Sequence, residues 1–282
     1  MKIILPPYDE SALGGGWSWI RNFKKAMGDT ITNNFEEADI FMIPSASMVD
    51  RETVLHAKEN GKKIVTRIDN IIRNSRNRNT GMSRMKDFSD WADLVIFQSE
   101  FAERLLNPYL QTEQWKVIYN SVDEGIFNDK NRVDGNNRYY YGKHSSDETK
   151  NWEMARVAYQ QIQQYNKEAT LNLVGRFDGN LQEYNFDFYS GEQFKYWGYV
   201  TDPQVMANIY KQSDWFIYTY FNDACSNSLI EALMCGVGIF DPYDMADTGG
   251  TPEILERFYK REGYFELKRM GDDYKLALAR IL

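Results

Sequence analysis

The feature of this sequence that most limits its fold is an alternation of short apolar runs with helical patterns of about ten residues. The apolar runs fall at 2–7, 38–44, 62–69, 93–99 and 115–121, and again at 138–143, 169–175, 195–200, 214–220 and 237–240. They lack polar alternation, which is typical of strands that are covered on both faces. The order therefore predicts βαβ units and parallel sheets, an α/β protein.

A polar segment divides this alternation into two halves. Residues 122–138, VDEGIFNDKNRVDGNNR, are rich in Asn, Asp and Gly and are predicted to be a linker. We expect two domains, at 1–125 and 126–262, each with a crevice at the carboxyl ends of its strands. Residues 263–282 carry a helical pattern of one or two helices, which is expected to pack back on the first domain.

Composition places the chain among large-core globular proteins. Of its 282 residues 43% are hydrophobic, and no apolar run approaches the ~20 residues of a membrane span. The start, MKIILPP, has no cleavable signal pattern, so a soluble, cytoplasmic protein is expected. Cys225 and Cys235 lie close together without metal-ligand companions, which predicts reduced thiols and no metal site.

Charge argues against broad binding to nucleic acid, because the formal net charge is −8. One segment, 67–86, departs from this balance and holds five arginines and Lys86 against the single acid Asp69. Two interpretations remain open for it, a solvated loop or a local anion site.

The stretch 223–236, DACSNSLIEALMCG, spaces two acids eight positions apart. One interpretation is local: Ser228 and Glu231 fit a capping box, and Gly236 ends the helix. This leaves the residues from Asp223 to Asn227 unexplained. The other interpretation is a helix start whose amides hold phosphate or sugar hydroxyls, with an acid on either side to accept hydrogen bonds from one polyhydroxylated ligand.

This second half resembles the donor-binding domain of glycosyltransferase family 4, the retaining GT-B enzymes. Asp223 and Glu231 have the interval of the family's two acids, and EALMCGVGIF is similar to its Glu-Ala-x-x-x-Gly-x-Pro-Val continuation. VIYNSVDEGIF, SSDETKN, LNLVG, YWGYV with SDWFIY, and TGGTPEIL follow in family order over roughly 130 residues, which is more specific than any one short motif. The resemblance implies a GT-B fold, two Rossmann-like parallel-sheet domains facing across a cleft.

The resemblance also implies a donor site. Asp223 would contact hydroxyls of the transferred sugar, Glu231 the ribose, and Lys150 the diphosphate. The backbone around Cys225, Ser226, Asn227 and Ser228, with Gly175 and the glycine loop at Gly15 and Gly16, would complete the site.

Three departures from the family pattern stand out. An arginine normally precedes the lysine, and here Lys143 and His144 are the available substitutes, although His144 also fits an exposed loop residue. The first acid is Asp instead of Glu, which shortens its reach by one methylene. Gly238 replaces a proline.

The first half lacks the histidine that family members commonly carry near the reacting sugar. Instead TRID places Arg67 and Asp69 at the end of a predicted strand. We expect Asp69 to contact the acceptor hydroxyl or donor sugar and Arg67 a phosphate; the alternative is a salt-bridged strand end. Arg73, Arg76, Arg78 and Arg84 border the acceptor side and suggest an anionic acceptor, such as an acceptor glycan, a lipid-linked phosphate reached by peripheral membrane contact, or, less in keeping with the charge, modified nucleic acid.

The predicted function is a retaining, metal-independent transfer of a sugar from a nucleoside diphosphate sugar to a hydroxyl, with no cofactor besides the donor. Cations and helix starts can stabilise the departing diphosphate without a metal. Two alternatives stay open. One is an epimerase or phosphorylase on the same fold, and the other is a non-catalytic protein that binds sugar nucleotides.

Overall fold

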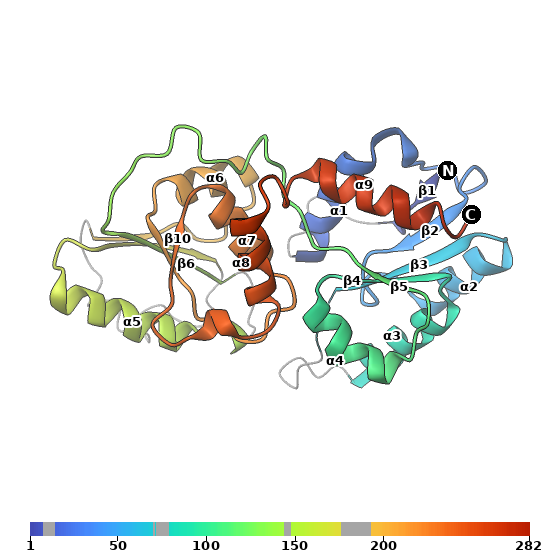
Figure 1. The fold of residues 1–282 in the computed structure, drawn as a ribbon, viewed down its shortest axis with the longest axis horizontal. Coiled ribbons are helices and arrows are strands. Elements are labelled where there is room, and N and C mark those ends of the chain that lie inside the picture. The colour runs from blue at the N-terminus through green and yellow to red at the C-terminus, as the bar shows by residue number, and fades with distance from the viewer. Residues whose placement is uncertain (8–14, 70, 72–78, 144–147, 176–192) are drawn as a thin grey trace. The chain divides into compact units, whose positions relative to one another are not determined.

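A computed structural model describes the chain except for residues 8–14, 70, 72–78, 144–147 and 176–192, drawn in grey in Figure 1. Gly14, His144 and the predicted acceptor-side residues Arg73, Arg76 and Arg78 lie outside the described residues. The chain divides into two compact units, and the first consists of residues 1–122 with 253–282. The second consists of residues 123–252. The predicted boundaries at 125/126 and 262/263 lie three and ten residues further along the chain.

The first unit is built on a parallel sheet in the order β1-β2-β3-β4-β5. The strands are β1 (Ile3–Ile4), β2 (Ile40–Ile43), β3 (Lys63–Ile68), β4 (Leu94–Phe97) and β5 (Trp115–Val117). Ile3 pairs with Ile40 in β2 and also makes a parallel bridge to Ile31. A strand residue can pair with two partners only if they lie on opposite edges of its strand. After β1 the chain therefore passes Ile31 on one edge of β1 and then forms β2 on the other edge. The direction of winding therefore reverses beside β1, which makes the carboxyl ends of β1 and β2 a topological switch point.

Helices cover both faces of this sheet. α2 (Arg51–Glu59), α3 (Asn79–Trp91) and α4 (Glu100–Leu110) connect successive strands, and α3 and α4 lie on the face opposite to α9 (Leu267–Leu278) (Figure 1). α9 packs on α1 (Gly15–Met27), with the Tyr274 ring 4.9 Å from that of Phe23. A Cβ at Gly271 would lie 2.7 Å from the Ala26 carbonyl oxygen, so only glycine permits this close approach. The C-terminal helix is thus part of the first unit's core.

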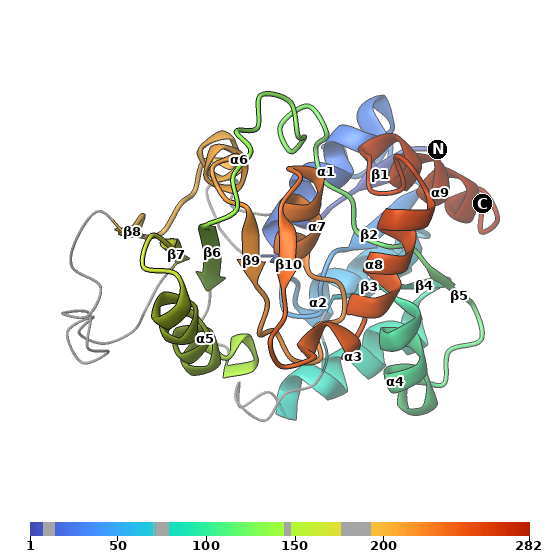
Figure 2. The ribbon, with the colours of Figure 1, turned by 60° about the vertical axis from the view of Figure 1, so that its left-hand side comes forward.

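The second unit holds a parallel sheet in the order β10-β9-β6-β7-β8 (Figure 2). β6 (Arg138–Lys143) leads through α5 (Trp152–Tyr165) to β7 (Thr170–Gly175) and on to β8 (Phe194–Tyr196). The chain then returns through α6 (Pro203–Lys211) to β9 (Trp215–Ile217), on the other edge of β6, and through α7 (Asn227–Met234) to β10 (Gly238–Phe240). The switch point of this sheet lies between β6 and β9.

Aromatic side chains fill the core of the second unit. Tyr140, Tyr210, Phe216, Tyr218 and Tyr220 are at most 1% exposed. Their rings meet edge-on, with that of Tyr140 4.8 Å from Tyr210 and 5.0 Å from Phe216. Such contacts add to the free energy gained from burial alone.

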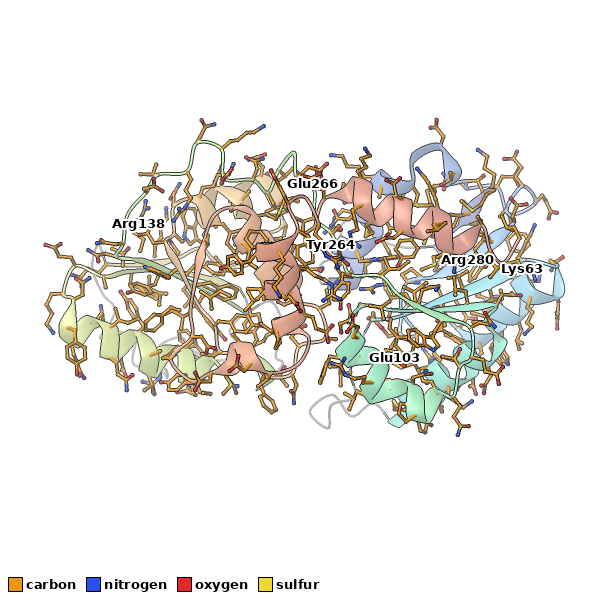
Figure 3. The ribbon with its side chains drawn as sticks, in the orientation of Figure 1. Lys63, Glu103, Arg138, Tyr264, Glu266 and Arg280 are labelled. Carbon is orange, nitrogen blue, oxygen red and sulfur yellow. The ribbon has the colours of Figure 1, made fainter. Side chains whose placement is uncertain are left out.

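A buried ion pair ties the amino ends of β6 and β9. Asp214 accepts from the backbone N–H and from Nε of Arg138, both at 3.0 Å. Figure 3 labels the Arg138 side chain. The Asp214 side chain is only 2% exposed. The Arg138 side chain is 25% exposed, and Arg132 lies 3.5 Å from the same carboxylate. Asp214 is therefore the buried member of the group, and its charge is balanced by two cations that water reaches.

The predicted helices and strands are observed as helices and strands, but several begin or end at other residues than predicted. Gly28, with a φ of +53°, ends α1 as predicted, but Gly15 and Gly16 form its first turn and not a preceding loop. The terminal pattern forms the single helix α9, and TGGTPEIL, predicted as a turn, runs into α8 (Thr251–Lys260). None of the helices in the described part of the chain combines the length and hydropathy of a membrane span.

Candidate donor site

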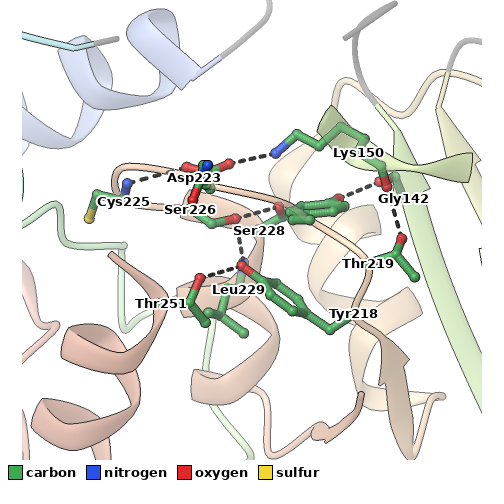
Figure 4. A network of polar contacts seen from close by, with 12 residues as sticks. Gly142, Lys150, Tyr218, Thr219, Asp223, Cys225, Ser226, Ser228, Leu229 and Thr251 are labelled. Atoms are coloured by element: carbon green, nitrogen blue, oxygen red, sulfur yellow. Dashed lines mark hydrogen bonds and ion pairs between the residues drawn. The ribbon is translucent and has the colours of Figure 1, made fainter. Parts of the chain in front are cut away.

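Predicted site residues gather at the switch point of the second unit. After β6 the chain forms the 3-10 helix η3 (Glu148–Lys150), and after β9 it runs through Asp223 to the start of α7. The carboxyl ends of neighbouring parallel strands meet at one edge of a sheet, so these two segments lie side by side. Lys150 and Asp223, which are 73 positions apart, face each other there (Figure 4).

Lys150 and Asp223 form a close ion pair. The Lys150 Nζ lies 2.7 Å from Asp223 Oδ2, and each side chain is 17% exposed. The same Nζ sits 3.6 Å from the centre of the Tyr220 ring, a cation–π contact. Tyr220 is buried, and its hydroxyl donates to the Gly142 carbonyl oxygen at the end of β6. Burial raises the pKa of Tyr220 well above its ordinary value, so the phenol stays neutral and serves as a donor.

The backbone of Lys150 is also held in place. Its carbonyl oxygen accepts from Thr219 Oγ1 at 2.8 Å and from the Tyr141 hydroxyl at 2.9 Å. Asn151 follows in the left-handed region with a φ of 52°, and its Nδ2 donates to the Thr219 carbonyl oxygen at 3.0 Å. These bonds fix the backbone around Lys150 to the segment that follows β9.

Asp223 occupies a turn held by glycines further along the chain. Its Oδ1 accepts from the Cys225 N–H at 3.2 Å, and its carbonyl oxygen accepts from Gly250 N at 2.8 Å. Gly249 has a φ of +67°, and a Cβ there would lie 2.6 Å from the Asp223 carbonyl oxygen. The TGGTPEIL motif is therefore part of the site, because only glycine fits against the backbone that carries Asp223.

The start of α7 lies beside this pair. Ser226 is the N-cap, and its Oγ accepts from Leu229 N at 3.4 Å. The predicted capping box of Ser228 and Glu231 is wrong, because Ser228 already lies within the helix and Leu229 occupies the position that the box requires to be acidic. The predicted helix end at Gly236 is confirmed by its φ of +78°. At a helix start the first N–H groups have no intrahelical acceptor and carry partial positive charge.

Glu231 lies more than one turn further along α7. It is half-buried and accepts from the Tyr210 hydroxyl at 3.3 Å. Gly175 ends β7 with a φ of +127°, where its N–H donates to Gly198 and its carbonyl oxygen accepts from Tyr196. Lys143 is the last residue of β6, at the edge where the Lys150 segment begins. Cys225 and Cys235 are buried and unbridged, as predicted.

The remaining predicted residues belong to the first unit. Gly15 and Gly16 begin α1, and Asp69 follows β3 with a partly exposed side chain. Arg67, in contrast, is only 2% exposed and engages neighbouring segments of its own unit. Arg84 lies in α3 and donates to the Ala46 carbonyl oxygen at 3.3 Å.

Several residues around Lys150 and Asp69 are not indicated by any sequence motif. Tyr220, Thr219 and Tyr141 support Lys150, and Gln98 connects Arg67 to Asp69. Each comes from a different segment than its partner, so no local motif marks it. In the described ranges no group of three or more His, Cys, Asp and Glu side chains could hold a metal ion.

Comparison with known proteins relates the second unit to a sequence family and the whole chain to solved folds. Residues 137–264 match the model of the family Glycosyl transferases group 1. This segment is similar to the domains that the family model describes, and it covers less than half of the chain. The enzyme class expected from the sequence is confirmed at that level.

Solved structures extend the likeness over the whole chain. Anabaena Alr3699/HepE in complex with UDP and glucose aligns with a TM-score of 0.65 at 15% identity, covering 100% of this chain and 95% of that chain. The pneumococcal O-GlcNAc transferase GtfA with UDP and GlcNAc gives 0.63 at 12%, over 94% and 60%. The UDP-forming trehalose-phosphate synthase from Burkholderia xenovorans, in complex with glucose-6-phosphate, gives 0.58 at 11%, over 93% and 77%. A search of curated proteins finds no match. At such identities the likeness concerns the fold, and the predicted GT-B class with two Rossmann-like parallel sheets is confirmed.

Proposed function

We propose that this protein is a retaining glycosyltransferase of family 4 that moves a sugar from a nucleoside diphosphate sugar to an acceptor hydroxyl without a metal ion. The observation that carries the proposal is the pairing of Lys150 with Asp223, at 2.7 Å, beside the start of α7 in the group 1 domain. One cation, one carboxylate and a helix start at the switch point of a parallel sheet suit a ligand that is both anionic and rich in hydroxyls.

The donor uses each of these groups in this proposal. Lys150 and the first amides of α7 hold the diphosphate, and Asp223 accepts hydrogen bonds from sugar hydroxyls. Glu231 binds the ribose, and Lys143 and His144 are the further groups proposed to face the diphosphate. The three solved structures reported above include two with UDP bound and one UDP-forming enzyme, so UDP is the first nucleotide to test.

The reaction breaks the bond between the anomeric carbon and the diphosphate oxygen, whose electron pair stays with the departing nucleoside diphosphate. Lys150 and the helix start stabilise this negative charge as it develops. The acceptor oxygen forms its bond to the anomeric carbon on the same face, and the departing phosphate oxygen takes the acceptor's proton. Asp69 contacts the acceptor hydroxyl or the donor sugar in this scheme.

The acceptor is proposed to be anionic, on account of the arginines that follow Asp69 in the sequence. A cytoplasmic location goes with the use of nucleotide sugars as donors. Both statements are independent of the donor site, so they can fail without affecting it.

The test is to incubate the purified protein with a mixed pool of nucleotide sugars and to identify the nucleoside diphosphate released, with and without EDTA. We expect one nucleoside diphosphate, released equally in both, and a loss of release in Lys150→Met. Asp134→Asn is a matched control, because this carboxylate is 93% exposed and lies away from Lys150 in the linker. Isomerised sugar nucleotide would indicate an epimerase. Binding without turnover with any acceptor would indicate a non-catalytic binding protein.

A further inference from the structure

Arg67 joins five segments at the carboxyl edge of the first sheet. From β3, its Nη1 donates to the Pro44 carbonyl oxygen at 3.2 Å, and its Nη2 donates to Gln98 Oε1 and Asn120 Oδ1, both at 2.9 Å. The guanidinium carbon lies 4.7 Å from the centre of the Trp19 ring of α1. Within the described part of the chain, every acceptor of Arg67 is an uncharged oxygen.

Gln98 connects Arg67 to Asp69 through hydrogen bonds. Its Oε1 accepts from Arg67 and, at 3.3 Å, from Asn120 Nδ2, so its Nε2 must face the other way. There Nε2 donates to the Asp69 carbonyl oxygen at 2.9 Å. Gln98 is only 4% exposed, so water does not compete for these bonds.

The burial of Arg67 argues against a direct contact with substrate. The side chain is 2% exposed, both of its terminal nitrogens are occupied, and the Trp19 ring covers its face. A guanidinium fork held by three acceptors is rigid, and a lysine could not reproduce it. We propose that Arg67 is a positioning residue that fixes the Asp69 backbone through Gln98 and does not itself bind phosphate.

This inference rests on the proposed function only in giving Asp69 a role at the reacting centre. The position of a reacting group matters because a displacement of about 1 Å can lower a rate by about a hundredfold. An alternative explanation is electrostatic: a buried charge without a carboxylate partner could act on an anionic substrate through its field alone. The two explanations differ in what Gln98 does, since only the positioning role requires the Gln98 amide.

Three variants separate these explanations. Arg67→Met removes the charge and the link, and Gln98→Met keeps the charge and removes the link. Asn120→Ala removes one acceptor of Arg67 and one donor to Gln98, but it keeps the hydrogen bonds from Arg67 to Gln98 and from Gln98 to Asp69. Thermal unfolding establishes that each variant is folded; if Arg67→Met is not, the other two decide. Two readouts are measured: hydrogen exchange of the peptide 64–71, and kcat and KM for the donor identified in the release assay.

We expect the peptide 64–71 to exchange about threefold to tenfold faster in Arg67→Met and Gln98→Met, because a segment whose Asp69 carbonyl oxygen is no longer anchored opens more often. We also expect kcat to fall at least about tenfold while KM for the donor changes less than about twofold. Asn120→Ala should show smaller changes than Gln98→Met in both readouts, because it weakens the link without removing it. Wild-type exchange and kcat in Gln98→Met would overturn the proposal, and so would a raised KM for the donor in Arg67→Met. If the wild-type protein releases no nucleoside diphosphate, the proposed function fails, and the exchange rates alone decide whether Arg67 positions Asp69.

Discussion

The Lys150–Asp223 pair leads to a prediction in which one substitution changes two affinities in opposite directions. In the structure the Lys150 ammonium lies 2.7 Å from Asp223. A diphosphate that binds Lys150 must therefore compete with this carboxylate. Asp223→Asn removes the competing charge and keeps an oxygen for the Cys225 N–H, so we expect it to strengthen the binding of UDP and to weaken that of UDP-glucose.

The magnitude follows from the surroundings of the pair. Exposed ion pairs contribute about 0.2–1 kcal/mol, and hydrogen bonds to charged groups about 1.5–3 kcal/mol. For side chains that are 17% exposed we take about 1 kcal/mol as the competition relieved, which is about a fivefold gain for UDP. UDP-glucose gains the same amount but loses a sugar hydroxyl bond worth about 1.5–3 kcal/mol, a net loss of roughly twofold to thirtyfold.

Isothermal titration of both ligands measures this difference. Asp134→Asn, which removes an exposed charge, controls for net charge and should change both affinities by less than about twofold. An equal loss of affinity for UDP and UDP-glucose in Asp223→Asn would refute the reasoning, because it would mean that Asp223 positions Lys150 for the diphosphate instead of competing with it.

Three further substitutions test the supports of the two units. Tyr220→Leu removes the aromatic ring that contacts Lys150 and should weaken UDP binding about twofold to thirtyfold. Tyr220→Phe keeps a ring and should weaken UDP binding less. Equal affinities of the two variants for UDP in a titration would contradict this. Asp214→Asn should lower the unfolding free energy by about 1.5–3 kcal/mol near pH 7, because it weakens the charged hydrogen bonds from Arg138 while leaving a partly exposed guanidinium. Burial raises the Asp214 pKa, but hydrogen bonds from Arg138 lower it further, so the pKa lies below its ordinary value. The difference in unfolding free energy between wild type and Asp214→Asn should therefore shrink as the pH falls below about 3.9. Chemical denaturation that gives the same difference at pH 3 and pH 7 would contradict this. Glu253→Ala should lower the free energy of unfolding by about 2–4 kcal/mol. The reason is that the Glu253 carboxylate accepts hydrogen bonds from two N–H groups at the start of α4 and from the Tyr119 hydroxyl. An unchanged midpoint of denaturant unfolding would contradict that role.

Much of the fold was open to prediction because its signals are local. Buried parallel strands appear as uninterrupted apolar runs, and each of the ten runs contains or overlaps an observed strand. The order of the strands was not open to prediction, since the bridge between Ile3 and Ile31 involves one residue pair outside any strand pattern. Helix starts were ambiguous for a related reason: both Ser226 and Ser228 have the chemistry of an N-cap, and the path of the chain from β9 decides between them.

The candidate donor site was predictable where one segment carries the whole pattern. Asp223 and the start of α7 belong to one motif, and Lys150 was named from its place in the order of motifs. Tyr220 lies three residues before Asp223, but its role depends on a lysine 70 positions away, which arrives through the fold. Arg67 shows what a strand-end charge leaves open: the sequence predicts a ligand contact for it, and only the fold reveals that its side chain is buried beside Trp19.

The most direct test of the donor site is a crystal structure of this protein with an intact nucleotide sugar bound. The account predicts the diphosphate within hydrogen-bonding distance of Lys150 Nζ and of the first amides of α7. It also predicts a sugar hydroxyl on Asp223 and a Lys150–Asp223 separation longer than 2.7 Å. A nucleotide sugar bound away from the ends of β6 and β9, with that ion pair unchanged, would contradict it.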